Sequence, residues 1–223
     1  FFSMSTRVPM GLVIEDGIYK SSSEEDTAIA FRSDGSVFLA DANITLTLTN
    51  QGGSQQANNA GQTVSLSCLN KTRSDNGLYL YNEYFSTVST RTTSAGWMVR
   101  LKVVEGALTL NSSVTLEVED VFLTDGDQIP HAQTIGEGYY ILTAAQVSGL
   151  EAEFSKFAVG DKIILSAVCQ DEALKQAAWA CGGGDVLVQS GQLTDSSSWG
   201  TSISSSPHPR TLLEIHADGS LQL

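Results

Sequence analysis

Apolar and polar residues alternate along much of this chain, which is typical of β-strands with one buried face. The clearest case is residues 44–49, where isoleucine or leucine alternates strictly with threonine. Residues 97–104 and 114–121 follow a similar pattern. Asp-Gly pairs tolerate the positive φ angles of tight turns, and those at 16–17, 34–35 and 218–219 are examples. The pattern therefore predicts many strands joined mainly as antiparallel hairpins.

Helical spacing of apolar residues is clearest in one stretch, at Val147, Leu150, Phe154 and Phe157. Thr143 and Gln146 fit a capping box before this apolar stripe, and Gly160 ends it. Residues 171–179 favour a second, shorter helix. Together these elements predict an α+β, β-rich fold with a mostly antiparallel sheet and one or two helices, organised as a single domain over residues 1–223.

The charge balance limits the partners that this chain can bind. Its 223 residues carry 25 acidic and 12 basic side chains, a formal net charge of −13. This excess of negative charge disfavours nucleic acid and anionic membrane surfaces, both of which are polyanions. No apolar run is long enough to cross a bilayer, so no integral membrane segment is expected. Abundant Ser, Thr, Asn and Gly with few Lys favour a secreted or extracytoplasmic location, in the periplasm or at the cell surface.

Cysteines and histidines give little sign of a metal or cofactor site. Cys68, Cys169 and Cys181 lack the spacing of a zinc site or a disulfide framework. Cys169 and Cys181 either form a bridge or remain free thiols, and their apolar neighbours favour free thiols. Because the motifs of nucleotide, dinucleotide and zinc-protease sites are also missing, we predict no metal and no cofactor.

Candidate chemistry gathers near the end of the chain. Residues 182–184 are three glycines before an apolar run, and a backbone without Cβ atoms lets a ligand or another strand approach closely. Arg210 follows Pro209, and a proline suits the first residue of a strand. The planar guanidinium of Arg210 matches phosphate or carboxylate. Among the histidines, His208 is the candidate because it lies beside Arg210. The simpler interpretation is a glycine turn followed by a solvated arginine.

A second arginine, Arg91, lies in a hydroxyl-rich segment next to Thr92. It is either a surface cation on a loop or a second group for an anionic ligand. Because the chain as a whole is strongly acidic, an anionic substrate would need such a local cationic pocket.

Several short motifs, taken in order, connect these candidates. They are Phe1-Phe2 before Pro9-x-Gly11, Leu80-Tyr81-Asn82 before Thr90-Arg91-Thr92, residues 138–142 before Gly160-Asp161, Gly182-Gly183-Gly184-Asp185-x-Leu187-Val188, and Pro209-Arg210-Thr211. In this order the chain resembles the phosphodiester glycosidase domain family, which includes the catalytic domain of the mannose-6-phosphate uncovering enzyme and bacterial relatives. The family continues at both ends with further glycine-rich and acidic segments. The resemblance therefore implies that the chain is a fragment of a longer domain, that a missing N- or C-terminal segment pairs with it, or that it is a degenerate relative of the family.

The resemblance implies a hydrolase that cleaves the glycosidic bond of a sugar-1-phosphodiester, releasing free sugar and a phosphomonoester. The sugar-phosphate or glycan-phosphodiester substrate is then the partner. The expected catalytic residues are Arg210, Thr211 and Asp185, with Glu214 as another acidic candidate. The expected substrate-binding residues are Arg91, Thr92, Gly182, Gly183, Gly184 and His208. The alternative is a non-catalytic extracellular module that binds carbohydrate or is purely structural.

Overall fold

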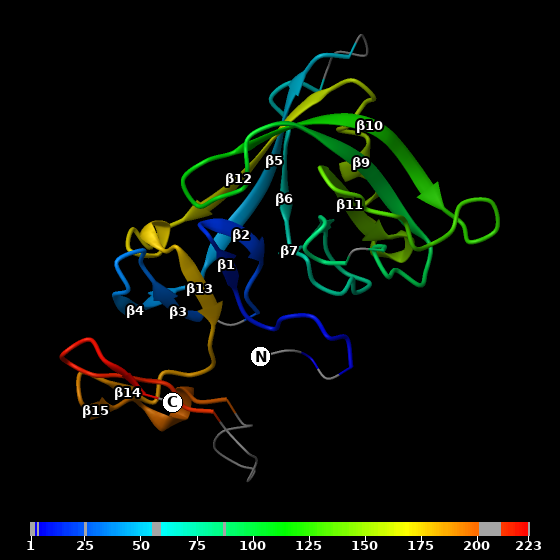
Figure 1. The fold of residues 1–223 in the computed structure, drawn as a ribbon. Helices are drawn as coiled ribbons and strands as arrows, with labels where there is room; N and C mark the ends of the chain where they lie inside the picture. Colours follow the sequence, from blue (N-terminus) through cyan, green and yellow to red (C-terminus); the bar gives the residue numbers. More distant parts are fainter. Residues whose placement is uncertain are drawn as a thin grey trace.

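The computed structural model describes residues 3, 5–24, 26–54, 59–86, 88–200 and 211–222. Most described elements are strands in two sheets of eight and five strands (Figure 1). The strand pairs are antiparallel except for β7 with β8, which is parallel. The prediction of a β-rich, mostly antiparallel fold is therefore confirmed.

The eight-stranded sheet is strongly curved and fills the upper part of Figure 1. Its strands, in spatial order, are β6 (Thr63–Leu66), β5 (Ile44–Gly52), β12 (Lys162–Cys169), β10 (Val114–Thr124), β9 (Gly96–Glu105), β11 (Tyr139–Ala145), β8 (Tyr79–Tyr81) and β7 (Cys68–Leu69). The threonine alternation of β5 has the expected effect, since Leu46 and Leu48 are buried while Thr45 is exposed.

The five-stranded sheet comprises β2 (Ile18–Ser21), β1 (Val13–Glu15), β13 (Trp179–Gly182), β3 (Thr27–Phe31) and β4 (Val37–Asp41) in that order. Its central strand, β13, comes from late in the chain and pairs with β1 and β3. The inner face carries small buried residues such as Ala28, Ala30 and Ala180. These side chains join residues of the larger sheet in one cluster of buried hydrophobic residues.

The helix predicted between Thr143 and Gly160 forms only as two short pieces. Thr143 lies inside β11, and the apolar stripe beyond it forms the 3-10 turn η1 (Gln146–Ser148) and the four-residue helix α1 (Glu151–Phe154). Gly149 separates the two with a φ of 71° in the left-handed region, which ends any continuous helix. Phe154 and Phe157 are nevertheless buried, so the apolar spacing reports packing without a long helix.

The second predicted helix is also short. Its stretch contains the 3-10 turn η2 (Leu174–Gln176) and then enters β13. Beyond β13 the chain forms two small hairpins, seen at the bottom of Figure 1. They are β14 (Val188–Gln189) with β15 (Gln192–Leu193), and β16 (Glu214–Ile215) with β17 (Leu221–Gln222), and η3 (Ser196–Ser198) follows the first.

Candidate functional site

The loop that carries Arg91 is fixed on both sides of that residue. The backbone N–H of Thr90 donates to the Gln133 carbonyl at 2.9 Å, and the Gln133 N–H donates back to the Thr90 hydroxyl at 3.0 Å. The hydroxyls of Thr90 and Thr92 lie 2.9 Å apart, and Thr92 donates to the His131 carbonyl. Both threonines are buried. Thr92 is therefore an anchor for the loop, and its hydroxyl is already engaged.

Between these anchors, Arg91 has a φ of 54°, in the left-handed region that non-glycine residues rarely adopt. This conformation leaves Arg91 exposed while its neighbours are buried. One guanidinium N–H donates to the Thr6 carbonyl at 3.3 Å, and the guanidinium carbon lies 5.3 Å from the centre of the Phe85 ring. No described carboxylate forms an ion pair with Arg91.

Arg73 is a structural arginine, and its hydrogen bonds provide a comparison for Arg91. Its guanidinium donates to the Thr143 hydroxyl at 3.0 Å, to the Ser94 carbonyl at 2.6 Å and to the Ser94 hydroxyl at 2.9 Å. One of its nitrogens also occupies the space that a Cβ on Gly96 would need. Arg73 is thus committed to the protein, whereas Arg91 keeps most of its N–H donors for solvent or a ligand.

The contact from Arg91 to Thr6 brings in residues 5–11, which we call the strap. Arg7, next to Thr6, is exposed, has a φ of 59° and has no side-chain partner among the described residues. Sequence reasoning missed Arg7, because a left-handed arginine has no sequence signature. The strap therefore places a second guanidinium in the chain segment that Arg91 contacts.

At its other end the strap meets the glycine run. A Cβ on Gly182 would lie 2.3 Å from the Gly11 Cα, so the two backbones approach as only glycines allow. The N–H of Gly182 donates to the Leu12 carbonyl at 2.7 Å, and that of Gly183 donates to the Thr27 carbonyl at 2.8 Å. The close approach expected at this run is thus made by another part of the chain. Of the three glycines expected to bind substrate, Gly182 and Gly183 therefore use their backbone N–H groups within the protein.

The remaining predicted residues lie beyond this run. Asp185 accepts the Gly200 N–H at 2.7 Å, while Gly184 has open space where a Cβ would be. Thr211 is exposed, and Glu214 begins β16. Arg210 and His208 lie outside the described residues. Whether Arg210 joins Arg91 therefore stays a prediction.

Lys71 is the most unusual charged residue near the strap, and sequence reasoning missed it too. It is only 2% exposed, and its ammonium donates to the carbonyls of Pro9, Met10 (3.0 Å) and Gly11 (3.3 Å). Burial lowers the pKa of Lys71 to about 8, although the nearby Glu24 opposes that shift.

A buried amide pair lies next to Lys71 in the sequence. The Asn70 amide donates to the Asn82 side-chain oxygen at 2.6 Å and to the Lys20 carbonyl at 2.7 Å. Asn70 also has a positive φ of 56°. These bonds fix the backbone from which Lys71 extends. The Leu80-Tyr81-Asn82 motif thus contributes to the support of the strap.

None of the predicted site residues lines either of two hollows on the described surface. The larger, of about 370 Å³, is lined by Ser65, Ser67, Asn76, Gly77, Leu78, Ser148 and Leu150. The smaller, of about 170 Å³, lies between η2 and the segment at Asn111.

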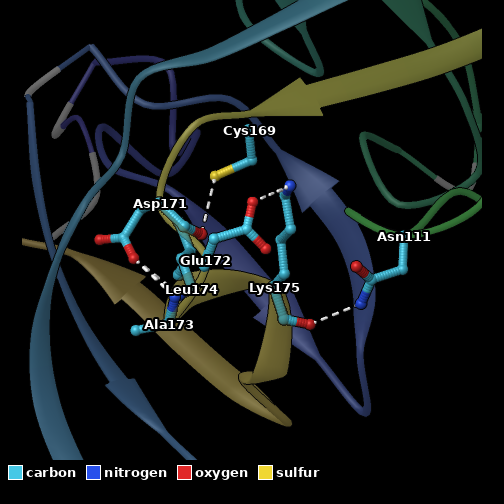
Figure 2. Close-up of polar contacts among 7 residues, drawn as sticks. All are labelled: Asn111, Cys169, Asp171, Glu172, Ala173, Leu174 and Lys175. Carbon is cyan, nitrogen blue, oxygen red and sulfur yellow. Dashed lines mark hydrogen bonds and ion pairs between the residues drawn. The ribbon is translucent and has the colours of Figure 1, made fainter.

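Figure 2 shows the polar contacts at the smaller hollow, where Asn111 donates to the Lys175 carbonyl at 2.7 Å. The Asp171 carboxylate accepts the N–H groups of Ala173 (2.8 Å) and Leu174 (3.1 Å), which lie at the start of η2. Burial opposes ionisation of Asp171, but these bonds and one from the Asp41 N–H outweigh it and lower its pKa. The contacts brace a turn and leave no free reactive group there.

The cysteines are free thiols, with Cys169 buried and Cys181 exposed. Within the described ranges, no group of His, Cys, Asp and Glu side chains could hold a metal ion. No described helix is long and apolar enough to span a membrane.

No family model matches the chain, and no curated protein matches it. Among solved structures, it is similar to a hypothetical protein from Synechocystis, with a TM-score of 0.72 and 16% sequence identity. The match covers 99% of this chain and 38% of that protein, so the chain spans well under half the length of the protein it resembles. At this identity the similarity concerns the fold alone.

Proposed function

We propose that this chain belongs to a hydrolase that cleaves sugar-1-phosphodiesters, with Arg91 as a ligand of the phosphate. The observation that carries the proposal is the placement of Arg91, which two buried threonines hold in an exposed left-handed conformation with most of its N–H donors unused. Fixing a guanidinium in this way has a cost in backbone strain that no internal ion pair offsets among the described residues. The ordered motifs around Arg91 and the glycine run supply the substrate class.

The chemistry suits a site whose main task is to bind an anion. When the bond between C1 of the sugar and the ester oxygen breaks, the electron pair leaves with the phosphate. A water oxygen then forms the new bond to C1, and its proton is released. The phosphomonoester is a good leaving group, so stabilising its charge matters more than protonating it. Arg91 would stabilise that negative charge, Arg210 would be the second guanidinium, and Asp185 or Glu214 would receive the proton from water.

An isotope experiment tests both the reaction and the bond that breaks. The chain is incubated in H₂¹⁸O with an N-acetylglucosamine-1-phosphodiester of a reporter alcohol, and the products are analysed by mass spectrometry. Cleavage at C1 places ¹⁸O in the free sugar, as we expect. ¹⁸O in the phosphate instead would identify an ordinary phosphodiesterase and contradict the proposal.

The role of Arg91 is tested with a matched control. Arg91→Ala should lower kcat/KM about 100-fold or more, since a charge-assisted contact to the phosphate is lost. Arg32 is the control, because it also lies over a phenylalanine, with its guanidinium carbon 4.2 Å from the Phe38 ring centre. Arg32→Ala should leave the rate unchanged. Equal activity of both variants would remove Arg91 from the mechanism.

A non-catalytic carbohydrate-binding module is the second candidate. The observation that favours it is that neither of the two hollows described above reaches Arg91 or the glycine run. Calorimetric binding of glycan phosphodiesters without turnover, weakened by Arg91→Ala, would support this candidate over the hydrolase.

A further inference from the structure

The strap is fastened by one buried cation. Three consecutive carbonyls of the strap, those of Pro9, Met10 and Gly11, point at the Lys71 ammonium. An ammonium has three N–H donors, so each carbonyl receives one. A neutral amine still has two, whereas an apolar side chain has none. Removal of the Lys71 amine should therefore loosen the strap, while loss of its proton leaves two donors and also removes the buried charge.

Few charges face Lys71. Glu24, whose backbone N–H donates to the Met10 carbonyl at 3.1 Å, and the Cys68 thiol are the titratable groups that act on it. The Glu24 carboxylate favours the protonated amine, as the Cys68 thiolate would, but burial outweighs both. Burial and Glu24 also raise the pKa of Cys68, so that thiol stays neutral around neutral pH and Glu24 is the charge that acts there.

The strap connects the two parts of the candidate site. Near its start, the Thr6 carbonyl accepts a hydrogen bond from Arg91, and Arg7 follows. At its end, Gly11 packs against Gly182, the first of the glycine run. The contacts with Lys71 lie between these two points. Displacement of the strap would move Arg7, remove a partner of Arg91 and uncover Gly182 together.

We propose that Lys71 is a positioning residue, which clamps the strap so that Arg7 and Arg91 are presented together to an anionic substrate. The clamp itself follows from the contacts of Lys71. Its effect on catalysis rests on the proposed function, and the two are tested separately.

Trypsin cleavage tests the clamp without the phosphodiester substrate, because the Arg7–Val8 bond lies within the strap. Cleavage at this bond, followed by mass spectrometry at pH 7.5, reports how often the strap opens. Lys71→Met, which keeps an unbranched chain but removes all three donors, should raise the cleavage rate at least tenfold. Lys102→Met is the control at an exposed lysine in β9 and should leave the rate unchanged. An unchanged rate in Lys71→Met, with an intact circular dichroism spectrum, overturns the clamp.

A second variant keeps the inference testable if Lys71→Met fails to fold. When the strap is open, Lys71 is hydrated and its pKa returns to about 10.4. The closed strap therefore binds fewer protons between pH 8 and pH 10, and closing becomes more favourable as the pH rises through that window. Cleavage at Arg7, relative to a free peptide of the same sequence, should fall several-fold from pH 8 to pH 9. Glu24→Gln removes the carboxylate that opposes the shift, so the fall should begin at lower pH. A profile that is flat, or unchanged in Glu24→Gln, overturns the protonation linkage.

Kinetics tests the positioning role. With the phosphodiester substrate, Lys71→Met should raise KM about tenfold with a smaller effect on kcat, because Arg7 and Arg91 lose their fixed arrangement. If Lys71→Met opens the strap but leaves KM unchanged, the positioning role is overturned. If the wild-type chain shows no turnover, the proposed function fails, while the proteolysis result still decides whether the clamp exists.

Discussion

Two buried charges lie in different parts of this molecule, and their partners differ in kind. Asp161, 1% exposed, accepts N–H groups of Asn50 (side chain, 2.8 Å), Ser54 (3.1 Å) and Ala158 (3.0 Å). Burial disfavours its ionised form, but these bonds outweigh that effect and lower the pKa of Asp161. Lys71 is equally buried, yet burial dominates and lowers its pKa to about 8.

The difference lies in what each charge holds together. The partners of Asp161 lie in β5 (Asn50), just after it (Ser54) and in the turn before β12 (Ala158), and these two strands already pair along the larger sheet. The partners of Lys71 come from the strap, which precedes the first strand. A buried charge stabilises whatever supplies its partners. Asp161 therefore supports the larger sheet, and Lys71 supports the strap, which carries Arg7 and contacts Arg91.

The largest effect is expected at Asp161. Asp161→Ala leaves three donors without an acceptor, so the free energy of unfolding should fall by about 3 kcal/mol or more. Chemical denaturation measures it, and Asp127→Ala, at an exposed carboxylate, serves as the control. If both variants lose the same stability, the Asp161 cluster is not a structural centre.

Gly182 comes next, because it is where the strap reaches the smaller sheet. Gly182→Ala would place a Cβ 2.3 Å from both the Gly11 Cα and the Leu12 nitrogen, which should cost about 2 kcal/mol of stability. Gly184→Ala meets nothing within 4 Å and should change stability by less than about 0.5 kcal/mol. Similar urea midpoints for the two variants would contradict the close packing of strap and β13.

The two charges should give the same sign of pH dependence, with stability rising as the pH rises, but in separate windows. The lowered pKa of Asp161 contributes stability that is present above its unfolded pKa of about 3.9 and is lost as the pH falls through its folded pKa. Lys71 contributes a rise in stability from about pH 8 to pH 10, with a slope of at most about 1.4 kcal/mol per pH unit.

Urea denaturation from pH 2 to pH 10 separates these contributions. Asp161→Asn should reduce the loss of stability at acid pH. Lys71→Met should reduce the rise in stability between about pH 8 and pH 10. A Lys71→Met profile that keeps the alkaline rise would assign that rise to other groups.

The smallest effect on stability is expected at Arg91. Arg91→Ala removes one 3.3 Å hydrogen bond and a loose ring contact, so the free energy of unfolding should change by less than about 0.5 kcal/mol. Arg73→Ala, which removes three bonds to Thr143 and Ser94, should cost about 1–3 kcal/mol. A large loss for Arg91→Ala would mean that this residue is structural after all.

Sequence patterns predicted the β-rich class because strand alternation is a local property. The threonine face of β5 needs no knowledge of its neighbours, and Gly219, with a φ of 83°, follows the turn preference of its Asp-Gly pair. The apolar stripe at 147–157 led to the prediction of a continuous helix, because apolar spacing is also a local property. Its burial pattern was real for Phe154 and Phe157, but Gly149 permits a left-handed break that spacing alone does not reveal.

The sequence by itself determined the strands, the tight turns, the acidic character and the glycine run. Only the tertiary structure decided which groups meet across long separations: Gly11 with Gly182, Lys71 with the strap, and Arg91 with Thr6. Local patterns encode propensity and burial, because those depend on neighbours in the chain. Partners of a buried charge, and the left-handed backbone of Arg7 and Arg91, depend on the whole packed arrangement, since only that arrangement offsets the strain and the desolvation.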